Sequence, residues 1–135
     1  MAIGQKNRVS INTEGDIVGV RKVVREKAAE IGFGVTDITR IVTAASELAR
    51  NIYRFAGTGV MYYEIVENEA KRGIQLIFED SGPGIENLDQ ALEEGYTSGG
   101  GLGLGLPGTK RLMDEMEIQS ESGRGTTVRV TKWLM

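Results

Sequence analysis

Hydrophobic residues recur at helical spacing along two stretches in the first half of the chain. Residues 16–31 carry apolar positions three and four apart, residues 38–52 carry a second such stripe, and a glycine follows each stretch. This spacing is typical of amphipathic helices that bury one face, and glycine commonly ends a helix. Because the side chains of Thr36 and Asp37 can accept hydrogen bonds from free N–H groups, we expect one of them to cap the second helix.

Residues 8–13 alternate between polar and apolar positions, as a short edge strand does, and residues 60–66 and 73–78 are expected to form adjacent strands joined by a polar turn. Pro107 suits the first turn of a helix and predicts one that runs to about Met116. The order β-α-α-β-β-lid-α-β-β predicts a single α/β domain over residues 1–135. We expect a two-layer sandwich, with a mixed, mostly antiparallel sheet that carries its helices on one face. The expected strands cover residues 8–13, 60–66, 73–78, 117–120 and 126–133, and a short helix or lid covers 87–94.

The composition limits the chemistry that this chain can perform. It has no cysteine and no histidine, so thiol catalysis, thiolate metal sites and histidine bases are excluded. Catalysis would have to rest on carboxylates, amides, hydroxyls and the backbone. The net charge of −3 argues against a nucleic-acid partner. No stretch is apolar for long enough to span a bilayer, and we therefore expect a cytoplasmic protein without a membrane partner.

The most unusual segment is GGGLGLGLPG, residues 99–108. Glycines allow tight turns and close approach of the backbone to a ligand, while leucines indicate packing against a core, and together they suggest a loop around nucleotide phosphates. Gly103, Gly105 and Gly108 formally match a dinucleotide fingerprint, but no strand precedes them and Val128 stands where an acid is needed. A P-loop is excluded because the chain has no Gly-Lys pair, and a eukaryotic-type kinase because it has no histidine.

The segment EDSGPGI, residues 79–85, offers a candidate for binding a nucleotide base. Asp80 ends a predicted strand beside Gly82 and Gly84. Its carboxylate can accept a hydrogen bond from an exocyclic amine, and glycines would leave room for a flat ring. Taken alone, the segment is explained as well by a plain β-turn.

The segment SELARN, residues 46–51, offers a candidate for phosphate chemistry. Glu47 and Asn51 are four residues apart and share one helix face. A carboxamide oxygen can bind Mg²⁺, and a carboxylate one turn away can accept a proton from an attacking hydroxyl. A solvated polar face would explain the pair equally well if it stood alone.

In this order, and with G-x-G-T at residues 123–126, the three motifs resemble the Bergerat-fold (GHKL) ATPases, the relatives of gyrase, Hsp90, histidine kinases and MutL. The resemblance covers nearly the whole chain and implies ATP and Mg²⁺ as cofactors. It also implies that Asn51 holds the metal, Glu47 is the catalytic base and Asp80 binds the adenine amine. The other nucleotide-binding residues that it implies are Gly82, Gly84, Ile85, Gly101, Leu102, Gly103, Leu104, Gly105 and Thr126.

Within that superfamily, the segments GDIVGVR, SELARNIYRFAG and GGGLGLGLPGTKRLMDE resemble the RsbT-like switch-protein kinases. The resemblance implies phosphorylation of serine or threonine on STAS-domain switch and scaffold proteins (RsbS-like and RsbR-like) of a stressosome. It also implies that the released kinase activates a PP2C-type, RsbU-like phosphatase. An RsbW- or SpoIIAB-like anti-sigma factor kinase that acts mainly as an ATP-gated binding module is the alternative.

One feature departs from many of these relatives. The expected lid, residues 86–98, contains no lysine or arginine that could reach the γ-phosphate. The nearest basic residues are Arg50, beside the predicted base, and Lys110 and Arg111, which a solvated helix face would also explain. We therefore expect slow ATP hydrolysis until a docked partner completes the site.

Overall fold

The structure is a computed structural model that describes residues 7–83, 105–121 and 123–134. The predicted lid lies outside these residues, and so do Gly84, Ile85, Gly101, Leu102, Gly103 and Leu104. No helix within the described ranges is long and apolar enough to cross a membrane. The elements are β1 (Asn7–Ile11), α1 (Gly15–Ile31), α2 (Val35–Phe55), β2 (Gly59–Asn68), β3 (Lys71–Asp80), α4 (Gly105–Leu112), β4 (Glu115–Glu121) and β5 (Gly125–Leu134).

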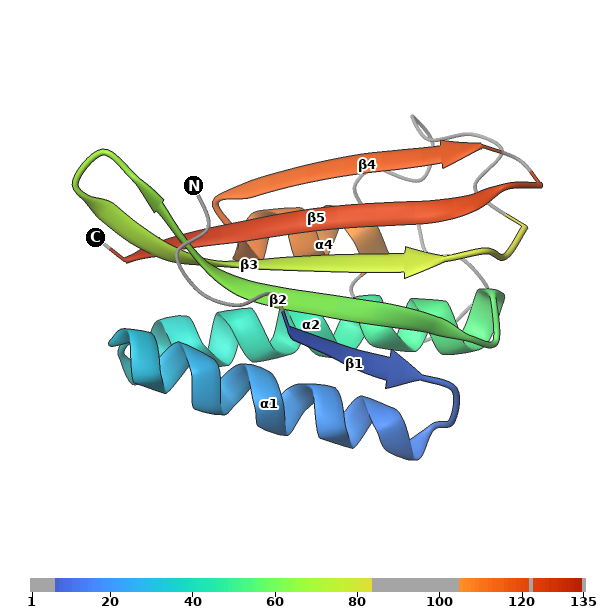
Figure 1. Ribbon diagram of the computed structural model, residues 1–135, viewed down its shortest axis with the longest axis horizontal. Helices are drawn as coiled ribbons and strands as arrows, with labels where there is room; N and C mark the ends of the chain where they lie inside the picture. The colour runs from blue at the N-terminus through green and yellow to red at the C-terminus, as the bar shows by residue number, and fades with distance from the viewer. Residues whose placement is uncertain (1–6, 84–104, 122, 135) are drawn as a thin grey trace.

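The five described strands form one sheet in the order β1-β2-β3-β5-β4 (Figure 1). Helices α1 and α2 pack against each other and against this sheet, and α4 packs beside α2. The apolar faces of helices and sheet meet in one continuous core. The predicted two-layer α/β sandwich is confirmed, and every strand pairing in the described residues is antiparallel.

The register of the sheet places a polar row at one end of its helix-covered face. Directly paired residues point to the same face, and faces alternate along each strand. Phe78 pairs with Val128, and both are buried in the core beneath the helices. Two residues further along, Asp80 pairs with Thr126, and Thr126 pairs with Ser120. These three polar side chains therefore lie on the same face as the core, at the edge where the core ends.

Helix α2 begins earlier than its apolar stripe predicts. Its N-cap is Gly34, whose backbone is extended, and no side chain caps the helix. The Ile38 N–H already donates to Gly34 O over 2.9 Å. The prediction that Thr36 or Asp37 caps the helix was wrong. Asp37 instead accepts a hydrogen bond from Arg40 over 2.9 Å on the surface of the first turns.

Helix α4 is shorter than predicted at its C-terminal end and covers Gly105–Leu112 instead of 107–116. Long-range contacts to β5 end it. The Asp114 N–H donates to Thr131 O over 3.0 Å, and the Asp114 carboxylate accepts from the Trp133 N–H over 2.7 Å. These bonds draw the chain into β4, which sequence periodicity alone does not reveal.

Candidate nucleotide site

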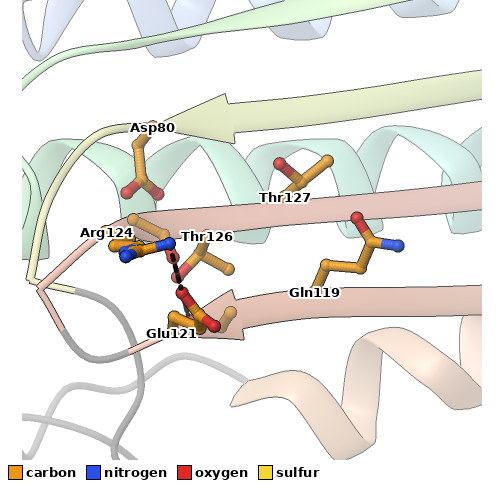
Figure 2. Close-up of a pocket in the computed structure, with 8 residues that line it drawn as sticks. Asp80, Gln119, Glu121, Arg124, Thr126 and Thr127 are labelled. Carbon is orange, nitrogen blue, oxygen red and sulfur yellow. Dashed lines mark hydrogen bonds and ion pairs between the residues drawn. The ribbon is translucent and has the colours of Figure 1, made fainter.

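A pocket of about 500 Å³ opens where β3 and β4 end and β5 begins. In Figure 2, Asp80 and Thr126 extend from the neighbouring ends of β3 and β5. The structure thus brings together two residues that were predicted from separate motifs. The described residues that line the pocket are Asp80, Gln119, Ser120, Glu121, Arg124, Gly125, Thr126 and Thr127.

The Asp80 carboxylate is held by the turn that follows its strand. The Gly82 N–H donates to Asp80 Oδ1 over 2.9 Å. Among the described residues, the other oxygen, Oδ2, has no hydrogen-bond partner. Asp80 is therefore fixed in orientation and keeps one oxygen as an acceptor for a ligand, as an exocyclic amine requires.

Gly82 has a packing role that the sequence did not predict. A Cβ at this position would lie 2.6 Å from the Ala56 Cβ and 2.9 Å from the Ala56 Cα. Ala56 is the C-cap of α2. The missing side chain therefore lets the Asp80 turn close onto the end of α2, a different purpose from the predicted space for a flat ring.

Thr126 also presents an acceptor to the pocket. The Ser120 hydroxyl lies 3.1 Å from Gly125 O, to which it can donate, and 2.8 Å from the Thr126 hydroxyl, where either oxygen can be the donor. In either direction, the Thr126 oxygen keeps at least one lone pair for a third group. Two acceptors, on Asp80 and Thr126, thus stand side by side and match a donor such as the amine of adenine.

The G-x-G-T turn packs directly onto the end of β3. Gly125 has φ +97°, and a Cβ there would overlap the Asp80 carbonyl oxygen and lie 2.9 Å from the Ser81 Cα. The Gly123 N–H donates to Pro83 O over 2.6 Å. Gly125 is therefore a structural part of the site, although the sequence motif alone did not assign it a role. Its positive φ and its close packing on β3 explain why a glycine stands at this position.

Glu47 is buried. The alternative explanation of the E-x-x-x-N motif, a polar helix face in contact with solvent, therefore does not hold for this residue. The residue is 5% exposed, and every residue of α2 from Ala44 to Ala49 is buried. Its carboxylate accepts from Arg50 Nη1 over 3.1 Å. Asn51, one turn along, is half-buried. Because a Cβ on Gly82 would meet Ala56, the C-cap of α2, the end of this helix lies against the Asp80 turn.

The described end of the glycine-rich segment forms the start of α4. Gly105 has φ +69°, and its carbonyl accepts from Thr109 Oγ1 over 3.1 Å. Leu106 is buried in the core, in agreement with the prediction that leucines anchor this segment. The free N–H groups of a helix start are suited to phosphate oxygens. Lys110, further along α4, is exposed.

The histidine kinase-like ATPase domain family matches residues 11–132 of this chain. The serine/threonine-protein kinase RsbT of Bacillus subtilis is 51% identical over 126 residues, which are 93% of this chain and 95% of that protein. The anti-sigma F factor of Bacillus cytotoxicus is 33% identical over 84% of this chain and 82% of its own length.

Two solved structures share the fold. The RsbU and RsbW domains of a Mycobacterium tuberculosis protein superpose with a TM-score of 0.63 at 23% identity, over 96% of this chain and 32% of that chain. The mycobacterial sensor histidine kinase MprB superposes with a TM-score of 0.56 at 19% identity, over 96% and 97%. At these identities, the structures support the fold alone.

The fold, the strand-end acceptors and the family match together define an ATP-binding domain of the histidine kinase-like ATPase class. Within this family, the chain belongs with the RsbT serine/threonine kinases of partner-switching pathways. The recognised family, the fold class and the kinase activity predicted from the sequence are confirmed.

Proposed function

We propose that this chain transfers the γ-phosphoryl group of Mg-ATP to a serine or threonine of a STAS-domain switch or scaffold protein. The observation that carries the proposal is the buried Glu47 carboxylate, on a helix whose end contacts the Asp80 turn. In a chain without histidine, such a carboxylate is suited to accept the proton of a substrate hydroxyl.

The nucleotide base would be bound at the strand ends. Asp80 Oδ2 and Thr126 Oγ1 would accept hydrogen bonds from the adenine amine, while the Gly82 N–H holds Asp80 in place. The N–H groups at the start of α4 would donate to the phosphates. We extend this site to Gly84, Ile85, Gly101, Leu102, Gly103 and Leu104 as predicted contacts.

Asn51 would hold Mg²⁺ through its carboxamide oxygen. Among the described residues, no group of three or more acidic side chains could hold a metal by itself. A single amide ligand fits magnesium, which keeps several waters and takes other oxygens from phosphates. When bound, the metal neutralises phosphate charge.

In the transfer step, Glu47 would accept the proton of the substrate hydroxyl as its oxygen attacks the γ-phosphorus. The new O–P bond forms as the bond to the β-phosphate oxygen breaks, and ADP leaves. Because Glu47 is only 5% exposed, little water reaches its carboxylate, which limits competing hydrolysis.

The released kinase would then bind and activate a PP2C-type phosphatase. The resemblance to RsbT supports this cycle. The 33% identity to anti-sigma F factors favours a second candidate, an anti-sigma kinase that acts mainly as an ATP-gated binding module.

Transfer of label from radioactive ATP to a purified RsbS-like STAS-domain protein tests the proposal. Wild-type protein should label the partner on serine or threonine. Glu47→Ala should lose about 10²–10⁴-fold in rate while it still binds ATP and the partner. A partner that is bound but never labelled would favour the binding module instead.

A further inference from the structure

The contact between Arg50 and Glu47 places a charged side chain on the predicted catalytic base itself. Arg50 Nη1 lies 3.1 Å from Glu47 Oε1, and the two residues are three apart on α2. The Glu47 side chain is 7% exposed, whereas the Arg50 side chain is 43% exposed. A half-exposed guanidinium therefore contacts a buried carboxylate.

The two oxygens of the Glu47 carboxylate have different surroundings. Oε1 is engaged by Arg50, and within the described residues Oε2 has no hydrogen-bond partner. In the same part of the chain, every fully enclosed side-chain oxygen has a partner. Oε2 is therefore not fully enclosed, and it remains open to accept a proton from a third group.

We infer that Arg50 is a positioning residue for Glu47: it holds Oε1 by a charge-assisted hydrogen bond, so that Oε2 faces the hydroxyl to be deprotonated. The inference rests on the proposed role of Glu47 as base. The position of Arg50 in the sequence suggests that it supplies a positive charge to the γ-phosphate. The inference assigns it the different role of holding Glu47. A guanidinium committed to a carboxylate fixes that carboxylate in a planar geometry.

The same helix provides a matched control. Arg40 Nη1 lies 2.9 Å from Asp37 Oδ1, again three residues apart, and these side chains are 48% and 36% exposed. Both pairs join an arginine to an acid at the same helical spacing, but only Glu47 is buried. Arg40→Gln therefore reports the cost of losing an ordinary surface pair from α2.

The test is a double-mutant cycle in the transfer assay, with the RsbS-like protein as substrate. We expect Arg50→Gln to lower kcat about tenfold to 100-fold, the range for a misplaced catalytic group. The KM for ATP and its calorimetric affinity should stay within about twofold, because Arg50 acts through Glu47 and not on the nucleotide. Arg50→Lys should recover part of kcat, since an ammonium can donate to Oε1 without the planar fork.

The cycle with Glu47→Gln separates the alternatives. In that background, Arg50→Gln should cause no further loss, because there is no base left to position. A further loss in the double variant, or a weaker ATP affinity in Arg50→Gln, would assign Arg50 to the phosphates and overturn the inference. A kcat in Arg50→Gln equal to that of Arg40→Gln, or above wild type, would also overturn it. Full activity of Glu47→Gln alone would instead refute the proposed base, and the inference with it.

Discussion

Replacing Asp80 with asparagine tests adenine recognition with little change of shape. The asparagine carbonyl can keep the 2.9 Å bond from the Gly82 N–H, so the turn stays in place. The amide NH₂ then occupies the position of Oδ2 and presents a donor where the adenine amine is also a donor. The variant therefore changes the chemistry of one atom that faces the ligand.

The expected loss follows from the hydrogen bond that is removed. A polar group that a bound base covers and leaves unpaired costs about 1–3 kcal/mol, which corresponds to an ATP dissociation constant raised about 5-fold to 150-fold. The same change should favour a base with an oxygen in place of the amine. The preference for ATP over ITP, measured by calorimetry, should therefore shrink or reverse in Asp80→Asn.

Glu79→Gln is the matched control for this experiment. Glu79 precedes Asp80 on β3, is exposed, and points to the opposite face of the sheet. Its variant should bind ATP and ITP as the wild type does. An unchanged ratio of ITP to ATP affinity in Asp80→Asn, with the fold intact by thermal unfolding, would refute adenine recognition by Asp80.

Three further predictions concern the metal, the packing of the site and acid stability. Asn51→Ala should weaken Mg-ATP binding and abolish transfer without unfolding the protein; metal-dependent transfer that persists would assign the metal elsewhere. Gly82→Ala should lower the free energy of unfolding in urea by about 1–3 kcal/mol, because the new Cβ meets Ala56, and adding Ala56→Gly should recover part of it. Hydrogen bonds from the backbone N–H groups of Asn12 and Thr13 hold the pKa of Asp16 below its ordinary value. Asp16 therefore stabilises the fold at a pH above the ordinary pKa of an aspartate. The difference in unfolding free energy between wild type and Asp16→Asn should close as the pH falls through the lowered pKa, and a difference that persists in acid would contradict this.

Much of the fold could be predicted from hydrophobic spacing because the buried faces are regular. The stripe of α2 and the alternation in β3 and β5 report burial directly. The ends of elements were less predictable, because contacts distant in sequence set them. Asp114 ends α4 through its bonds to β5, and Gly34 begins α2 without any side-chain cap.

The site shows the same division. Asp80 and Thr126 could be named from their motifs, but their register as direct neighbours follows from the pairing of β3 with β5. The role of Gly82 in packing on Ala56 has no sequence signal beyond the glycine itself. The burial of Glu47 was also not predictable, since an E-x-x-x-N pattern fits an exposed helix face equally well.

The central claim, that this chain is a kinase completed by its protein substrate, is tested most directly by comparing two single-turnover rates. One is the transfer of phosphate from ATP to the RsbS-like protein, and the other is the release of phosphate to water by the chain alone. Because the segment 86–98 carries no basic residue, transfer should exceed release by orders of magnitude, with about 10³-fold expected for a supplied cation. Equal rates, or an unlabelled partner, would contradict the account and indicate a free-standing ATPase or a binding module.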